Sequence, residues 1–229
     1  MIKCNPIHTE ILHQGVDAWN RWRKANPAEK PHLDGVYFGP ELMCGINLKG
    51  AFLRGCEFDN TELSWSDCSF ANFEDSSLVG VRLERAQLRG AQMNRVNLRR
   101  STLYRADLSM IRLQEADLLE ADLSQALLVN SELQGANFTL ARLPCANLSN
   151  ADMTGVCIRD WFTTQDTNFR GVKCDYIYRH SDPSNAQASG WQFTQRVPSA
   201  GSNFVQGEWE LMHKHLHTVR EMIESRSWH

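Results

Sequence analysis

An apolar residue recurs at every fifth position of this 229-residue chain from Leu33 to Ile158, and this period limits the folds that are open to it. All 26 positions are occupied without a gap, among them Phe58, Leu98 and Leu148. A second series, two places earlier, consists mostly of Ala, Ser, Thr or Val. The period is neither the 3.6 residues of a helix nor the 2.0 of a strand. It therefore predicts a repeat architecture.

The repeat predicts a four-sided tube. If every fifth residue points inward, the chain must turn after each five-residue side, and four sides close a coil. Coils then stack through backbone hydrogen bonds at roughly 4.8 Å, so the repeats make a tube roughly 30 Å long. Gly or Asn often stands two places after the apolar centre, as at Gly55, Gly80 and Asn130. Type II turns need a positive φ at one central residue, which Gly and Asn tolerate.

The repeat also resembles a known family. The stretches ADLLEADLSQA at 116–126 and ANLSNADMTG at 146–155 resemble the A(D/N)LXX motif of pentapeptide-repeat proteins. The resemblance implies an all-β solenoid, a right-handed quadrilateral β-helix, with helical caps at both ends. We accordingly divide the chain into an N-terminal helical cap (1–31), a pentapeptide-repeat β-helix (32–178) and a C-terminal loop and helix (179–229).

The N-terminal segment predicts a cover for one end of the tube. A solenoid exposes hydrogen-bonding edges at its ends, and these need protection. From about Thr9 to Ala25 the sequence predicts one amphipathic helix, with Trp19 and Trp22 on its apolar stripe and a stop at Asn26–Pro27. A Trp-rich helix of this kind also suits membrane or partner binding, but its mixed charges favour the cap. Its WNRWRKANP segment is similar to flanks of bacterial, notably cyanobacterial, family members.

The period slips near the C-terminal end of the tube. After Ile158 it continues one residue late, at Phe169 and Cys174. Residues 180–207 are rich in Ser, Gly and Pro, and they predict an ordered loop. A second helix is expected from about Glu208 to Ser225, either docked on the tube or pairing two chains. The chain is therefore expected to be a monomer or a homodimer through the C-terminal helix.

Motifs for catalysis and metal binding are missing from the sequence. It contains no GxGxxG, Walker loop, GxSxG or HExxH, so we expect no catalytic residue, no cofactor and no metal. In HKHLH, His213 and His217 share a helix face while His215 points away, and a metal site would need a carboxylate from elsewhere. An unrecognised enzyme remains an alternative, and it would have to use the loop at 180–207.

Composition indicates the compartment and the kinds of partner. The seven cysteines form no CxxC pair, which favours a reducing, cytoplasmic setting. No run of 18 apolar residues and no signal-peptide pattern is present, so no membrane association is expected. A net charge of −3 gives no general attraction to nucleic acid, and direct nucleic-acid binding is not expected.

Outward charges form rows in which each member stands four repeats after the one before it, so that row members would be neighbours in successive coils. Opposite signs stack in these rows and predict ion pairs that fix the register. The predicted pairs are Arg54/Glu74, Glu62/Arg82, Arg95/Glu115, Arg100/Glu120 and Asp122/Arg142.

Along the tube axis the charges form three bands. Residues 33–81 carry a net charge of −6, residues 82–112 carry +6, and residues 113–158 carry −5. We call 82–112 the arginine belt. The resemblance implies one known activity, because quinolone-resistance members mimic DNA in shape and negative charge and engage type II topoisomerases. A DNA mimic needs negative potential along the whole rod, and the arginine belt interrupts it.

Within the belt, one corner gives a candidate interaction face. Trp65, Arg85 and Arg105 belong to a single row, and Tyr104 adjoins Arg105. Two arginines beside a tryptophan suit a carboxylate or phosphate on a partner, with Arg85 packed on the indole. The alternative is a surface stack that satisfies itself. We therefore expect a non-enzymatic interaction or regulatory scaffold for an unknown protein partner; the alternative is a DNA-mimicking inhibitor or protector of a type II topoisomerase.

Overall fold

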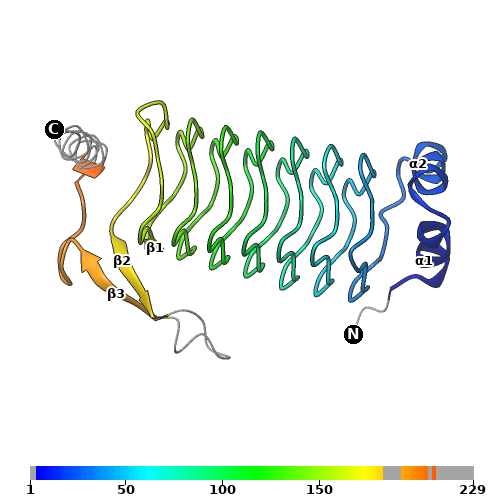
Figure 1. Cartoon of the computed structure of the whole chain (residues 1–229), viewed down its shortest axis with the longest axis horizontal. Coiled ribbons are helices and arrows are strands. Elements are labelled where there is room, and N and C mark those ends of the chain that lie inside the picture. The colour runs from blue at the N-terminus through cyan, green and yellow to red at the C-terminus, as the bar shows by residue number, and fades with distance from the viewer. Residues whose placement is uncertain (1–3, 183–191, 206–207, 210–229) are drawn as a thin grey trace, which may run out of the picture.

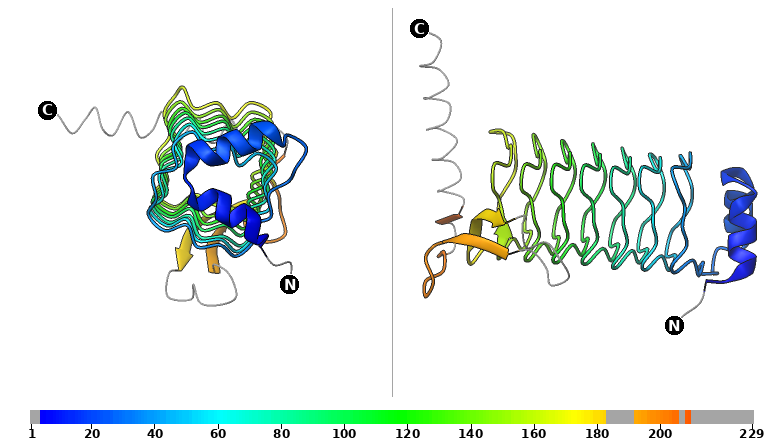
Figure 2. Two further views of the ribbon diagram at one scale, coloured as in Figure 1. Left: turned by 90° about the vertical axis from the view of Figure 1, so that its right-hand side faces the viewer. Right: turned by 60° about the horizontal axis from the view of Figure 1, so that its bottom comes forward.

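From residue 32 onward the chain winds into a four-sided tube of stacked coils (Figure 1). The computed structural model describes residues 4–182, 192–205 and 208–209. Parallel bridges join each residue that precedes an apolar centre to its equivalent four repeats later, from His32↔Phe52 to Arg142↔Phe162. One coil therefore consists of four five-residue sides, and the expected four-sided β-helix is confirmed. Seen from its end, the tube has a square outline (Figure 2).

Backbone hydrogen bonds between coils hold each side of the tube. The amide of an apolar centre donates to a carbonyl of the next coil, as from Leu53 to Asn72 at 2.7 Å. The amide one place before a centre donates to the previous coil, as from Glu57 to Val36 at 3.1 Å. Each side thus has bonds in both directions along the axis, which is the pattern of a parallel sheet.

The interior of the tube is filled with side chains. Every apolar centre from 33 to 153 is buried, and so is every residue two places before a centre from 46 to 156. Large centres alternate with small neighbours, so the coils pack closely. Cys56 and Cys68 are buried in the tube, and burial raises the pKa of each thiol to about 12.

Every corner of the tube between residues 45 and 160 has the same backbone conformation. The residue two places after each centre has a positive φ in all of these turns. Gly and Asn at these corners were predicted to adopt it. The same conformation is imposed on Trp65, Arg85 and Leu140, where L side chains incur a steric cost.

Two short helices lie across the first coil (Figure 2). Helix α1 spans Pro6–His13 and helix α2 spans Val16–Ala25. The prediction of one helix from Thr9 to Ala25 is wrong, because the chain turns at Gly15, whose φ is 94°. Glycine reaches this conformation without a steric penalty and so permits the break.

Helix α2 satisfies the exposed hydrogen-bonding edge of the first coil. Trp19 is fully buried, and its indole Nε1 donates to the carbonyl of Asn47 at 2.7 Å. The Asn20 side chain donates to the carbonyl of Gly45 at 2.9 Å and accepts from the amide of Asn47 at 2.8 Å. These side chains take the place of a preceding coil and block pairing with another chain.

A small sheet lies at the other end of the tube. Strand β1 (Val156–Cys157) pairs in parallel with β2 (Ile177–Asp182), which pairs antiparallel with β3 (Gln192–Val197). The prediction of a loop throughout 180–207 is therefore wrong. A loop was predicted because the segment as a whole is rich in Ser, Gly and Pro. The average composition did not indicate the two six-residue strands, IYRHSD and QFTQRV.

The last coil confirms the slip by one position. Asn147 bridges to Asn168, whereas Leu127 bridges to Asn147, so the later bridge is one position longer. Aromatic rings of Trp161, Phe169, Phe204 and Trp209 then meet with centroids 5.7 to 6.2 Å apart. The predicted helix at 208–225 and the histidines of HKHLH lie outside the described residues, apart from 208–209. Within the described ranges, no helix has the length and apolar content needed to span a membrane.

Candidate interaction face

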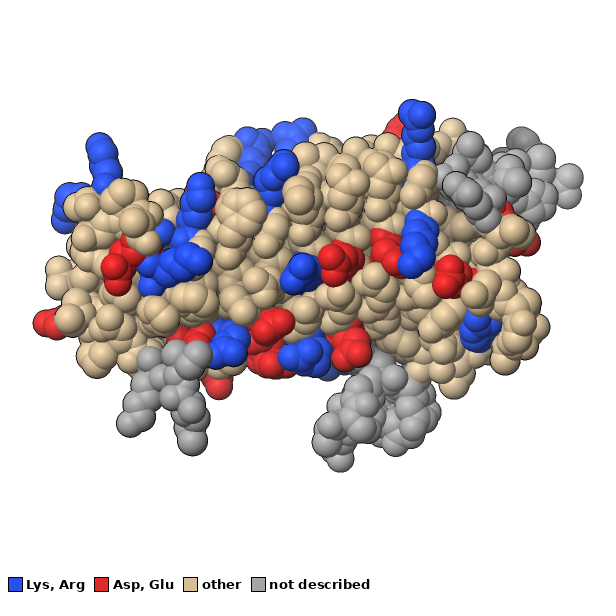
Figure 3. All heavy atoms as spheres, turned by 180° about the vertical axis from the view of Figure 1, so that it is seen from behind, with Lys and Arg blue, Asp and Glu red and all other residues tan. Residues whose placement is uncertain are grey.

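Ion pairs join outward charged side chains of neighbouring coils. Arg82 pairs with Glu62 at 3.1 Å, and Arg100 pairs with Glu120 at 3.0 Å, as the rows predict. On the face shown in Figure 3, acidic and basic side chains lie next to one another in rows along the tube. Such exposed pairs contribute at most about 1 kcal/mol each, so they fix register more than they stabilise the fold.

Three of the predicted pairs are different in the structure. Arg54 pairs with Asp34 at 3.2 Å, and Arg95 makes two bonds with Asp75, at 2.7 and 3.0 Å. Each of these arginines has a carboxylate on both neighbouring coils and can reach only one, and Arg95 takes the partner that gives a bidentate contact. Arg142 lies 5.2 Å over the Phe162 ring instead of pairing with Asp122.

The candidate residues gather along one side of the tube. We call this side the arginine face. Four successive coils contribute one segment each to it: residues 65–70, 85–90, 105–110 and 125–130. The Arg85 guanidinium carbon lies 4.6 Å from the centroid of the Trp65 ring, which confirms the predicted stack. The contact is a cation–π interaction in a partly exposed setting.

The other arginines of the face are also held by uncharged groups. Arg105 lies 5.0 Å over the Tyr104 ring, and its Nε donates to Gln125 Oε1 at 2.7 Å. Arg89 donates to the sulfur of Met110 at 3.5 Å. Sequence reasoning missed Arg89, although its place four positions after Arg85 puts it at the other edge of the same side.

The arginine face differs from the rest of the belt in its lack of carboxylate partners. In the part of the chain that the structure describes, Arg85, Arg89 and Arg105 form no ion pair within 4.0 Å. The other five arginines of the belt each pair with a carboxylate: Arg82, Arg95, Arg99, Arg100 and Arg112. The uncompensated positive charge of the belt is therefore concentrated on this one side.

Two carboxylates lie on the arginine face between its edges. Asp67 accepts the amide of Ser69 at 3.0 Å, and Asp107 accepts that of Ser109 at 2.9 Å. Each carboxylate is thus engaged by its own turn, two places on, in the manner of an Asx turn. They lower the net positive charge of the face without pairing with its arginines.

Exposed apolar side chains are concentrated on the same side. Trp65, Phe70, Met110 and Leu127 have exposed fractions of 59%, 55%, 50% and 43%. Between residues 45 and 160, Leu140 is the one other large hydrophobic residue that is exposed to this degree. Clustered apolar exposure next to charged donors is a mark of interaction sites.

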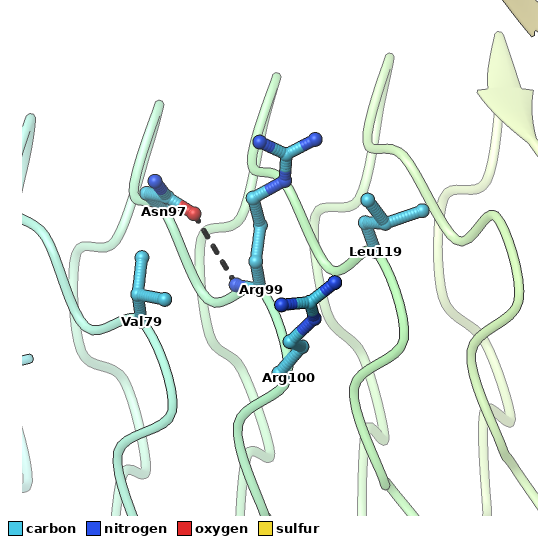
Figure 4. Close-up of a pocket in the computed structure, with 5 residues that line it drawn as sticks. All are labelled: Val79, Asn97, Arg99, Arg100 and Leu119. Carbon is cyan, nitrogen blue, oxygen red and sulfur yellow. Dashed lines mark hydrogen bonds between the residues drawn. The ribbon is translucent and has the colours of Figure 1, made fainter. Parts of the chain in front are cut away.

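A shallow hollow lies on another side of the tube. It has a volume of about 240 Å³ and is lined by Val79, Asn97, Arg99, Arg100 and Leu119 (Figure 4). Both of its arginines are already paired, Arg99 with the buried Asp117 at 3.0 Å and Arg100 with Glu120. Burial raises the pKa of Asp117, although Arg99 opposes that shift. The hollow thus offers no uncompensated charge to a ligand.

Metal binding has no support in the described part of the chain, where no group of three or more His, Cys, Asp or Glu side chains is placed to hold an ion. The predicted two-histidine alternative at HKHLH lies outside the described residues.

The geometry defines the class of the protein: a four-sided β-solenoid with a filled interior. The model of the family Pentapeptide repeats matches residues 66–160 in eight copies. The chain is a pentapeptide-repeat protein with a right-handed four-sided β-helix, and its coils extend beyond the matched segment.

Several solved structures are similar to the chain. QnrB1, a plasmid-mediated fluoroquinolone resistance protein, is 18% identical over 64% of this chain and 84% of its own, with a TM-score of 0.31. HetL, involved in heterocyst differentiation regulation in the cyanobacterium Nostoc sp. strain PCC 7120, is 19% identical over 70% and 96%, with a TM-score of 0.27. Rfr23 from the cyanobacterium Cyanothece 51142 is 27% identical over 60% and 89%, with a TM-score of 0.26. No curated protein matches the chain significantly.

Proposed function

We propose that this protein is a non-enzymatic interaction scaffold that binds a partner protein through the arginine face. The observation that carries the proposal is a set of three arginines, Arg85, Arg89 and Arg105, which have no carboxylate partner among the described residues and lie beside exposed aromatic rings. Arg and aromatic residues dominate the binding energy of protein interfaces. Backbone hydrogen bonds between coils on every side of a filled tube hold such a surface rigidly. The protein therefore loses little conformational entropy when a partner binds.

A test uses charge reversal on the face. Arg85→Glu/Arg105→Glu should reduce recovery of the partner at least about tenfold, because two charge-assisted contacts are lost and two repulsive ones gained. The matched control is Arg142→Glu/Arg179→Glu, which changes the net charge equally on exposed residues of other sides of the tube. Affinity capture from the source cells, with quantitative mass spectrometry, measures both. Equal recovery with the two double variants would refute the proposal.

A DNA-mimicking inhibitor or protector of a type II topoisomerase has less support. Several carboxylates next to the belt form ion pairs with its arginines, as at Glu62–Arg82 and Arg112–Glu132. The remaining positive charge faces outward at the middle of the rod. Negative potential is thus interrupted where a mimic needs it. Inhibition of gyrase supercoiling by excess protein, or protection of gyrase from a quinolone, would favour the mimic.

We also propose a reducing, cytoplasmic setting. Cys56, Cys68 and Cys174 are buried, and burial raises the pKa of each thiol to about 12. They behave as small apolar side chains of the tube wall. Localisation of a tagged chain by fractionation tests this part of the proposal.

A further inference from the structure

We infer that the arginine face binds an acidic protein segment whose carboxylates are flanked by aromatic or aliphatic side chains. The inference rests on the proposed function and adds the chemistry of the partner. It follows from the order of side chains along the axis. One coil carries Trp65 and Phe70, the next carries Arg85 and Arg89, and the third carries Arg105 and Met110, followed by Leu127. Along the tube axis, exposed apolar side chains thus lie before and after the three guanidinium groups.

The arginines are arranged to receive carboxylates. Arg85 lies over Trp65, and within the described residues the N–H groups of its guanidinium have no hydrogen-bond acceptor. In the same part of the chain, the Arg105 guanidinium donates only from Nε, to Gln125, so its two terminal nitrogens are available. A ring covers one face of each guanidinium and leaves the in-plane donors open, which is the geometry for a bidentate carboxylate. The contacts already restrict the rotamers, so less entropy is lost when a ligand binds.

The spacing of the donors suits a segment with more than one carboxylate. Arg85 and Arg105 stand at one edge of the face in successive coils, about 4.8 Å apart along the axis. Arg89 stands at the other edge, beside Gly90. A Cβ at Gly90 would lie 2.7 Å from the Phe70 ring, so this glycine leaves room for the ring. The exposed Phe70 ring is thus an apolar contact against the residue that follows Arg89.

Charge along the tube favours an acidic peptide over a nucleic acid. The arginine belt covers roughly 7 Å of the axis. On either side of it, residues 33–81 carry −6 and residues 113–158 carry −5. A nucleic acid gains affinity by neutralising many phosphates, and any strand longer than the belt would meet these acidic bands. Asp67 and Asp107, in the middle of the face, repel any anion and so limit the number of negative groups that the face can hold. A short acidic segment fits within the belt.

The experiment is a selection from a random peptide display library against the full chain, followed by titration. We expect the selected peptides to be enriched in Asp and Glu with Phe, Trp or Leu beside them. Synthetic copies should bind the Arg85→Gln/Arg89→Gln/Arg105→Gln variant at least about tenfold more weakly. The control, Arg95→Gln/Arg100→Gln/Arg112→Gln, removes the same charge from paired arginines on other sides and should bind like the parent. Circular dichroism verifies that both variants fold.

The outcomes separate the inference from the proposed function. Selected peptides without acidic enrichment, whose binding still depends on Arg85, Arg89 and Arg105, would overturn the inference and keep the face as a binding site. Acidic peptides that bind both variants alike would overturn the face itself, and with it the proposed function. A single-stranded oligonucleotide that binds more tightly than the peptides, and through the same arginines, would overturn the acidic partner. A selection that yields no binder also counts against the inference.

Discussion

At the scale of single residues, the corners of the tube show a conflict between side chain and backbone. Each corner residue from 45 to 160 has a positive φ, whether it is Gly55, Arg95 or Leu140. This left-handed conformation costs an ordinary L residue about 1–2 kcal/mol, whereas Gly adopts it freely and Asn adopts it readily. The hydrogen bonds between coils fix the turn and override the preference of the residue.

Substitutions at two corners test this conflict. Leu140→Asn should raise the free energy of unfolding by about 1 kcal/mol, because Asn tolerates the conformation that the half-exposed leucine resists. Gly55→Ala should lower it by about 1 kcal/mol, although a Cβ there meets no atom within 4 Å. Urea denaturation measures both. A destabilised Leu140→Asn variant would show that side-chain contacts outweigh the backbone term.

A second prediction concerns His8, which lies on the buried face of α1. Its Nδ1 accepts the amide of His32 at 3.0 Å, and its ring lies 5.0 Å from that of Trp22. Burial lowers the pKa of His8, against the opposing influence of Glu29. The unfolded chain therefore binds the extra proton first as pH falls. The stabilisation is complete above the ordinary histidine pKa of about 6.5 and is lost as pH falls below it.

Stability curves against pH check this prediction. The His8→Gln variant should lose part of the fall in stability between about pH 7 and pH 5. The exposed His13→Gln variant should keep the parent profile. If the His8→Gln and parent profiles run parallel, the His8 contact does not respond to protonation.

At the scale of elements, the five-residue period predicted the tube, its filled core and the one-residue shift of the period after Ile158. Each of these depends on one inward side chain per side of the tube. It did not predict that α1 and α2 separate at Gly15, since an amphipathic stripe continues across the break. The β2–β3 hairpin was also missed, because its pairing joins residues separated by a polar, turn-rich stretch.

The sequence predicted part of the candidate face. The rows of coil-to-coil neighbours placed Arg85 on Trp65, because stacking of coils is set by the period alone. The same rows could not decide which neighbour each arginine pairs with, since carboxylates stand on both sides of Arg95. Arg89 and Met110 were missed because they lie at the far edge, in a different row.

The cap provides a prediction for one element. Trp19→Phe removes the indole donor to the carbonyl of Asn47 and should lower the free energy of unfolding by about 1–3 kcal/mol. The control is Trp22→Phe, since the indole nitrogen of Trp22 makes no hydrogen bond within the described part of the chain. Urea denaturation gives the loss, and hydrogen exchange at the Asn47 amide locates it. A larger effect at Trp22 would contradict the assigned role.

At the scale of the whole molecule, stability comes from repetition of one coil. Each coil contacts only the coils before and after it, so removing a complete coil leaves the two new neighbours in register. The side chains of the arginine face that carry the proposal all precede residue 131. The length of the tube and the integrity of the face are therefore separable.

Two deletions test this separation. Removing residues 131–150 takes out one complete coil, and we expect a folded tube shorter by about 4.8 Å that keeps its arginine face. Removing only residues 131–133 shifts every later residue out of phase, which places small side chains such as Ala146 at central positions and turns polar ones such as Ser149 toward the core, and should unfold the C-terminal part. Circular dichroism and small-angle X-ray scattering measure both. A deletion of 131–133 tolerated better than the deletion of the whole coil would contradict a fold governed by the coil period.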